Sequence, residues 1–310
     1  MLKESLFYAK ILLFGEYGII DDAMGLSIPY TDYSGTFSYS ETEKSEKSNA
    51  DLKQFYNYLK SLQEKNKLIA PLDLDKFGEE INKGIHFSSS IPQGYGVGSS
   101  GALVAAVYQR YSNEIISVDK ANDSHYLMLL KQIFGQMESF FHGKSSGLDP
   151  LICYLQIPIL VKSKTDLNSV GLPLQGTGKG AIFLLDTGET GATQPLVEWF
   201  MEQLKEKGFR KMFQEQFKKY NDDCIKDFLK GDSKPLFKNI KKLSTLLLDN
   251  FKPMIPQVFH KLWLEGINSG NYYLKLCGSG GGGYILGFTQ DIQQAQKSLA
   301  KHKLEVIHRF

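Results

Sequence analysis

Cysteine is scarce in this sequence, with only Cys153, Cys224 and Cys277 among 310 residues. These three lie far apart and form no CxxC pair, which argues against a disulfide framework and against a structural zinc site. We therefore expect three reduced thiols in the protein core.

Long hydrophobic runs are missing as well. No apolar segment approaches the length of a bilayer span, and the N-terminal stretch contains Lys10 and Glu16 but no small-residue cleavage site, unlike a signal peptide. Hydrophobic residues at 42% and charged residues at 23% are close to globular averages, which excludes intrinsic disorder. We expect a cytoplasmic protein with no membrane partner. Its length predicts two domains or one large α/β unit.

Charge of one sign is not in large excess, since the net charge is +2, but its distribution is uneven. Residues 1–155 carry 14 basic and 19 acidic side chains, and the rest carry 22 and 15. A basic second half raises the question of nucleic-acid binding. No basic patch interleaved with aromatic residues accompanies these lysines, so we interpret them as solvated helix faces and predict no nucleic-acid partner.

Apolar periodicity predicts a mixture of strands and helices. We expect several short strands within residues 5–39, a surface loop over 41–50, helices over 55–62 and 74–84, and a strand over 85–91. The clearest helix spans 125–142 and ends at Gly143. Residues 150–161 and 181–186 are strand-like, 195–269 are helical, and strands over 271–277, 284–288 and 304–310 flank a helix over 295–302. The pattern predicts an α+β protein with domains 1–180 and 181–310.

A glycine-rich segment, residues 92–102, leads directly into an apolar helix. Alternating Gly94, Gly96 and Gly98 let the backbone approach a ligand closely, and the N–H groups at a helix N-terminus favour an anion such as phosphate. A tight strand-to-helix connection with a serine cap is the simpler alternative.

The same segment also satisfies the dinucleotide fingerprint GxGxxG from Gly96 to Gly101, with Asp119 at a tolerable distance. A Rossmann unit is therefore a rival hypothesis. The preceding strand, HFSSSI, is too polar for a parallel strand buried on both faces, which argues against it.

A second glycine run, residues 277–283, contains five glycines between two strand-like segments. Ordering so many glycines is entropically costly, and the cost is tolerable where backbone packs against backbone or ligand. A flexible linker would not be flanked by strands.

Two carboxylates stand out. Glu138 lies within the apolar stripe of its predicted helix, where a carboxylate is costly unless a cation or metal pairs with it. Asp149 follows eleven residues later, before Pro150; taken alone, it could be a helix N-cap.

Together these segments resemble the GHMP superfamily of small-molecule kinases, most closely the mevalonate kinases, along nearly the whole chain. The family's first motif, typically PGKVILFGEHAVV, is similar to residues 9–20, its second, PxGxGLGSSAA, to 92–102, and its third, LTGAGGGG, to 276–283. The mevalonate kinase pattern GExxxHGxPSGxDN is similar to the stretch from Glu138 to Asp149. Residues 186–188 and 193–197 resemble a further family stretch.

The resemblance implies a two-domain GHMP kinase fold, with an N-terminal ribosomal protein S5 domain 2-like domain and a C-terminal ferredoxin-like α/β sandwich. It implies that ATP and Mg²⁺ are the cofactors and that the γ-phosphate passes to a small-molecule alcohol. Asp149 would be the general base, paired with Lys10, while Ser100 and Glu138 would hold Mg²⁺. The nucleotide would lie against Pro92, Gly94, Gly96, Gly98, Ser99, Ser100 and Gly101, and the orienting residues would be Glu16, Thr193, Gly278, Ser279, Gly280 and Gly281.

The implied acceptor is the primary hydroxyl of mevalonate, a step of isoprenoid precursor synthesis. Phosphomevalonate, homoserine or sugar kinases are alternatives, as is a non-catalytic nucleotide-binding protein. A second copy of the chain, forming a homodimer, is a further partner that we consider. Ala9, Tyr17 and Pro150 depart from the family's Gly, His and Asn without removing a charged catalytic group. The galactokinase motif GEHTDY is absent, and a phosphorylated acceptor would call for more cations than Arg110, the only arginine in residues 1–155.

Overall fold

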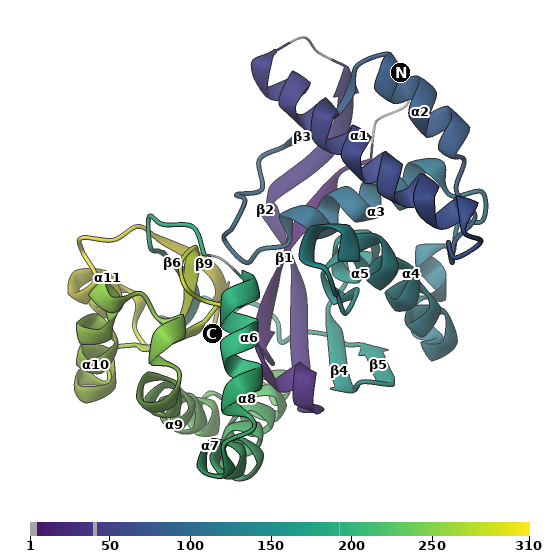
Figure 1. The fold of residues 1–310 in the computed structure, drawn as a ribbon. Coiled ribbons are helices and arrows are strands. Elements are labelled where there is room, and N and C mark those ends of the chain that lie inside the picture. Colours follow the sequence, from purple (N-terminus) through teal and green to yellow (C-terminus); the bar gives the residue numbers. More distant parts are fainter. Residues whose placement is uncertain (1–4, 40–41, 192) are drawn as a thin grey trace.

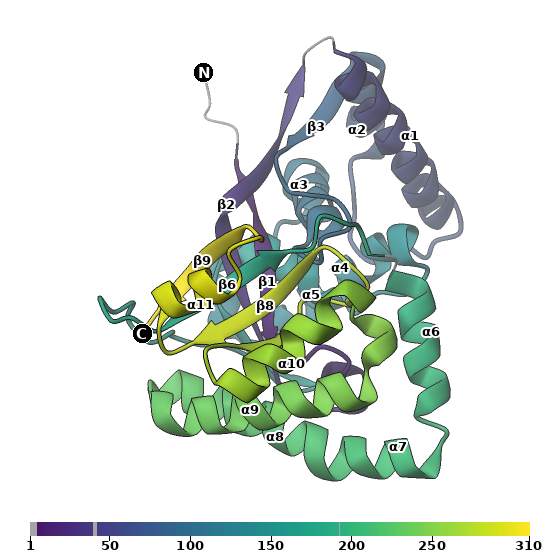
Figure 2. The ribbon, with the colours of Figure 1, turned by 90° about the vertical axis from the view of Figure 1, so that its left-hand side faces the viewer.

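Two antiparallel β-sheets, each covered by helices, organise the chain (Figures 1 and 2). The computed structural model describes residues 5–39, 42–191 and 193–310, with Asn122 and Thr193 described by their backbone alone. The first sheet is built from residues 7–169 and the second from residues 181–309.

The first sheet has the strand order β1-β2-β4-β5, with β3 pairing with the far half of the long strand β2. Helices α3 and α5 pack on β1 and β2, while α1 and α2 lie beside β3 (Figure 1). The elements are β1 (Phe7–Phe14), β2 (Gly25–Tyr39), β3 (Ile85–Ser89), β4 (Ile159–Ser163), β5 (Asp166–Ser169), α1 (Glu43–Glu64), α2 (Leu74–Asn82), α3 (Ser99–Tyr111), α4 (Ser124–His142) and α5 (Leu148–Leu155).

The second sheet has the order β7-β8-β6-β9. Helices α9 and α10 pack against β7, and α8 also reaches β1 and β2 of the first sheet (Figure 2). The elements are β6 (Ala181–Asp186), β7 (Tyr273–Leu276), β8 (Tyr284–Thr289), β9 (Leu304–Arg309), α6 (Thr193–Gln203), α7 (Lys207–Met212), α8 (Lys218–Lys230), α9 (Ser233–Asn250), α10 (His260–Ser269) and α11 (Ile292–Ser298). Short helical turns join them: 3-10 turns at Gly18–Asp21, Val118–Asn122, Lys252–Met254 and Gln257–Phe259, and a π-helical turn at Phe213–Phe217.

Most of the predicted elements are confirmed. Helix α4 begins one residue before the prediction and ends at Gly143, whose φ of 70° lies in the left-handed region. The strands predicted after residue 181 and the helices predicted within 195–269 are present, and the mixed composition agrees with the predicted α+β class. The helix predicted over 295–302 is displaced, because α11 begins at Ile292, after the Asp291 N-cap, and ends at Ser298. The domain boundary at 180/181 falls between the two sheets and stays a prediction.

The surface loop predicted over 41–50 is wrong, because α1 begins at Glu43. The Thr42 side chain accepts a hydrogen bond from Ser45 N, and the Ser45 side chain accepts one from Thr42 N. This reciprocal capping box, with Glu43 and Glu46 in the first turn, starts a helix in a segment without a large apolar group.

The strand predicted over 150–161 is also wrong in its first half, which forms helix α5 before β4. From Leu148 to Leu155 only Asp149 is more than slightly exposed. A helix buried on almost every side lacks the alternation of apolar and polar residues that marks a helix in a sequence.

The several short strands predicted within residues 5–39 are two strands. The segment GEYGII is a turn followed by a 3-10 helix, and the two strand-like pieces of residues 26–39 form one continuous strand, β2. A bulge opposite Tyr8 and Ala9 accommodates the turn-like residues in its middle.

The Rossmann alternative is excluded by topology. Strand β3, which leads into the first glycine loop, pairs antiparallel with β2, whereas a dinucleotide-binding unit needs parallel strands joined by a crossover helix. All three cysteines are buried and free, as predicted. Within the described ranges, no helix combines the length and apolarity that crossing a membrane requires.

Candidate active site

The first glycine loop is fixed between β1 and α5. The predicted nucleotide residues Pro92, Gly94, Gly96, Gly98, Ser99, Ser100 and Gly101 run from the end of β3 into the first turn of α3. Lys10 N donates to Val97 O at 3.0 Å. A Cβ on Gly98 would lie 2.8 Å from Lys10 Cγ, and one on Gly101 would lie 2.9 Å from the Asp149 carbonyl carbon. Glycine is therefore required for β1, the loop and α5 to approach one another.

Lys10 and Asp149 form an ion pair at this meeting point. The distance from Lys10 Nζ to Asp149 Oδ2 is 2.8 Å, and Lys10 Nζ also donates to Gly96 O at 3.2 Å. Burial alone would lower the pKa of Lys10, but the Asp149 carboxylate outweighs it and raises that pKa. Asp149 is the second residue of α5 rather than its N-cap, which is Gly147. The pair thus holds a cation and a partly exposed carboxylate beside the glycine loop.

Glu138 lies next to this pair and is buried. Ser100 Oγ donates to Glu138 Oε1 at 3.0 Å, and Ser145 Oγ donates to Glu138 Oε2. Burial, and after it the charge of Asp149, raises the pKa of Glu138 to about 7, although both hydroxyl groups lower it. The site therefore concentrates negative charge that a cation would stabilise.

Two residues of this cluster were not among the predicted site residues. Ser145, which holds Glu138, stands where the mevalonate kinase pattern has proline, so the resemblance gave no reason to select it. The Nε2 atom of His142 lies 3.1 Å from Ser100 Oγ. The sequence did contain a feature that could have identified His142, because it matches the histidine of the mevalonate kinase pattern.

Ser100 and Glu138 have the oxygen donors that Mg²⁺ prefers. Within the described ranges, no group of three or more His, Cys, Asp or Glu side chains could hold a metal ion by itself. Mg²⁺ at phosphate-transfer sites uses one or two protein ligands and completes its shell with phosphate oxygens and water. The donor set fits an ion that arrives with phosphates.

The two glycine-rich loops pack against each other. A Cβ atom added at any of three glycines would meet backbone of the other loop. On Gly96 it would lie 2.9 Å from Cys277 O, on Gly278 it would lie 3.1 Å from Gly96 Cα, and on Gly283 it would lie 2.4 Å from Tyr95 Cα. Gly191 joins them, because its N–H donates to Gly94 O at 3.1 Å. The cost of ordering residues 277–283 is thus met by backbone packing beside the Lys10–Asp149 pair.

Glu16 points toward the second sheet. Its Oε2 atom accepts a hydrogen bond from Lys275 Nζ of β7, and both side chains are buried. Its Oε1 atom has no hydrogen-bond partner within the described part of the chain. Burial raises the pKa of Glu16 despite the nearby Lys275. Glu16 therefore ties the first motif to the strand before the third motif.

Thr193 opens α6, but its side chain lies outside the described residues. Of the other predicted orienting residues, Gly278, Ser279, Gly280 and Gly281 all belong to the third motif. Ser279 O accepts a hydrogen bond from Tyr17, and Gly281 N donates to Met254 O at 2.7 Å.

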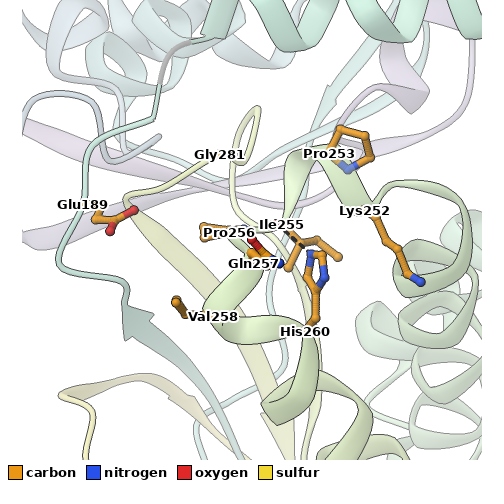
Figure 3. Close-up of a pocket in the computed structure, with 9 residues that line it drawn as sticks. All are labelled: Glu189, Lys252, Pro253, Ile255, Pro256, Gln257, Val258, His260 and Gly281. Carbon is orange, nitrogen blue, oxygen red and sulfur yellow. Dashed lines mark hydrogen bonds between the residues drawn. The ribbon is translucent and has the colours of Figure 1, made fainter.

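A surface cavity of about 620 Å³ borders the third motif (Figure 3). Neither Lys10, Asp149, Ser100 nor Glu138 lines it. Its lining is Glu189, Lys252, Pro253, Ile255, Pro256, Gln257, Val258, His260 and Gly281. Among these, Gly281 belongs to the third motif and Glu189 O accepts a hydrogen bond from Gly283 N at 2.5 Å.

The arrangement has the parts of a phosphate-transfer centre. Backbone N–H groups of a glycine loop and the start of a helix can hold an anion. A carboxylate beside a buried lysine can take a proton from a hydroxyl group, and the lysine can stabilise charge on the oxygen. Glu138 and Ser100 can accept a divalent cation.

Comparison with known proteins supports this interpretation. Residues 57–156 match the family model of the GHMP kinases N terminal domain. A search of curated proteins finds no match.

Solved structures of several kinases have a similar fold. The L. major mevalonate kinase in complex with R-mevalonate has a TM-score of 0.63 and 14% identity, covering 97% of this chain and 91% of that chain. The Streptococcus pneumoniae phosphomevalonate kinase has a TM-score of 0.60 and 13% identity, covering 99% and 100%. The Lactococcus lactis galactokinase complexed with galactose has a TM-score of 0.65 and 14% identity, covering 98% and 92%. At such identities the likeness concerns the fold, and it confirms the predicted α+β GHMP kinase fold.

Proposed function

We propose that this chain, which contains a GHMP kinase N-terminal domain within a GHMP kinase fold, transfers the γ-phosphate of ATP to the primary hydroxyl of mevalonate. The observation that carries the proposal is the 2.8 Å ion pair between Lys10 and Asp149 beside a glycine loop, with Glu138 and Ser100 adjacent. A phosphotransferase needs a positioned nucleophile, neutralised phosphate charge and a group that takes the hydroxyl proton.

Each group has a chemical role in the proposed reaction. Asp149 accepts the proton of the acceptor hydroxyl as the new O–P bond forms and the bond to the leaving ADP breaks. Lys10, which is paired with Asp149, stabilises negative charge at the attacking oxygen. The backbone of residues 94–101 holds the phosphates. Mg²⁺, held by Ser100 and Glu138, would neutralise charge on the β- and γ-phosphate oxygens.

The one arginine of residues 1–155 is not available to bind a phosphorylated acceptor. Arg110, the only arginine in residues 1–155, makes a two-pronged ion pair with Glu80, at 2.7 Å and 3.0 Å. Its guanidinium group is therefore engaged away from Asp149, and Lys10 is the cation that contacts Asp149. A phosphorylated acceptor needs further cations to bind its charge. This favours mevalonate over phosphomevalonate.

A panel of acceptors tests the proposal. Purified protein with ATP and Mg²⁺ is incubated with mevalonate, phosphomevalonate, homoserine or galactose, and ADP release is measured. We expect release with mevalonate. If ADP is released with one of the other acceptors but not with mevalonate, the protein is a kinase but the assigned substrate is wrong. Absence of release with every acceptor, together with thermal stabilisation by ATP and Mg²⁺, would favour the non-catalytic nucleotide-binding protein.

A further inference from the structure

The third glycine motif, residues 277–283, needs external support to hold one conformation. All five glycines of the motif have positive φ: Gly278, Gly280, Gly281, Gly282 and Gly283. Without supporting contacts, a segment so rich in glycine would adopt many other backbone conformations. Several hydrogen bonds come from its own half of the molecule: Gly281 N donates to Met254 O at 2.7 Å, Gly283 N donates to Glu189 O at 2.5 Å, and Thr187 donates to Gly283 O from its backbone N–H at 3.0 Å and its hydroxyl at 2.7 Å. Figure 3 shows Gly281 and Glu189 beside the same cavity.

A further support comes from the first motif. The hydroxyl of Tyr17 donates to Ser279 O at 2.6 Å, across 262 residues of sequence. Ser279 lies between Gly278 and Gly280, so this hydrogen bond fixes a peptide in the most adaptable part of the motif.

Tyr17 is itself rigid. Its φ of 60° lies in the left-handed region, which a tyrosine adopts only when its surroundings enforce it. Tyr17 is 6% exposed, and its ring centroid lies 4.8 Å from that of Phe200 on α6 and 6.3 Å from that of Phe251. A ring held in this way can aim its hydroxyl at one acceptor atom. Burial raises the pKa of Tyr17, so the hydroxyl keeps its proton and donates.

We propose that Tyr17 is a positioning residue, whose hydroxyl holds the third glycine motif in register with the first motif and thereby keeps it packed against the first glycine loop. Its effect on nucleotide binding and turnover rests on the proposed function, whereas its effect on the conformation of the motif does not. The Tyr17 hydroxyl donates to Ser279 O, so Tyr17 acts on the reaction through the position of the motif.

The test compares Tyr17→Phe with Tyr154→Phe. Both variants keep the ring and lose one hydroxyl that donates to a backbone carbonyl, since Tyr154 donates to Ile116 O at 2.8 Å. Amide hydrogen exchange of a peptide covering residues 277–283 is measured together with the kcat and KM for the acceptor and the Kd for ATP with Mg²⁺.

We expect exchange in residues 277–283 to become about threefold to tenfold faster in Tyr17→Phe, the change expected for loss of one hydrogen bond. The Kd for ATP with Mg²⁺ should rise by a similar factor, because the third motif packs against the first glycine loop, which holds the phosphates in the proposed function. Tyr154→Phe should alter none of these. Unchanged exchange in Tyr17→Phe, or equal acceleration in both variants, would overturn the proposal. If the wild-type protein releases no ADP, the proposed function fails, and hydrogen exchange still decides whether Tyr17 holds the motif.

Discussion

Lys10 Nζ and Asp149 Oδ2 are 2.8 Å apart, yet the two side chains meet very different surroundings: the lysine is 3% exposed and the aspartate 36%. An ion left buried without its partner costs far more than one that water can reach. Removing the Asp149 carboxylate should therefore destabilise the fold more than removing the Lys10 ammonium group.

We predict that Asp149→Asn lowers the free energy of unfolding more than Lys10→Met does. The first variant leaves the buried Lys10 ammonium without its carboxylate, whereas the second leaves a carboxylate that water can hydrate. Urea unfolding at neutral pH measures both. Equal losses, or a larger loss in Lys10→Met, would contradict the burial argument.

Glu138→Gln should weaken the response of the enzyme to Mg²⁺. The neutral amide is a poorer ligand than the carboxylate that Ser100 and Ser145 hold in place. We expect the Mg²⁺ concentration for half-maximal ADP release to rise about tenfold or more. The control variant is Glu80→Gln, which removes a carboxylate that binds Arg110 and Tyr111. It should leave the half-maximal Mg²⁺ concentration unchanged. A wild-type Mg²⁺ response in Glu138→Gln would remove Glu138 from the metal site.

The contact between the glycine loops predicts a difference between two glycine-to-alanine variants. Gly96 and Gly84 have similar positive φ values of 76° and 86°, so alanine costs roughly 1 kcal/mol of backbone strain at either position. Only at Gly96 does the new Cβ meet another backbone atom, Cys277 O at 2.9 Å; at Gly84 it meets nothing within 4 Å. Gly96→Ala should therefore lose additional unfolding free energy and most turnover, while Gly84→Ala keeps its turnover. Similar behaviour of the two variants would show that the loops do not need their close approach.

His308 should make the fold sensitive to acid. Its Nε2 atom is buried without a hydrogen-bond partner in the described structure, its ring lies 5.3 Å from those of Phe228 and Phe310, and burial lowers its pKa. The unfolded chain therefore binds the proton first as pH falls, so stability is present above about pH 6.5 and is lost below it. His308→Phe should lose less unfolding free energy between pH 7.5 and 5.5 than the wild type. An identical pH dependence in His308→Phe would contradict the assignment.

Local sequence was sufficient for the parts of the site that lie within motifs. Glycine alternation before an apolar helix predicted the first loop, and a carboxylate in an apolar helical stripe predicted that Glu138 has a special environment. The resemblance predicted the Lys10–Asp149 pair, and the two residues do meet.

The remaining features depend on contacts that local pattern does not contain. Helix α5 is buried too completely to show a period, and α1 starts from a capping box in a polar segment. Ser145 acts by reaching Glu138 across a turn, and Glu16 finds Lys275 across 259 residues. Folding brings these residues together, so local sequence patterns do not predict their contacts.

The account is tested most directly by the turnover of Asp149→Asn. ADP release is measured with the acceptor that the wild type uses, and binding of ATP with Mg²⁺ is measured by calorimetry on the same preparation. We predict that turnover falls by about 100-fold to 10,000-fold, the range for loss of a general base, while the Kd for ATP stays within about threefold of the wild type. Turnover close to the wild-type value would contradict the assignment of Asp149 as the base and, with it, the catalytic role of the ion pair.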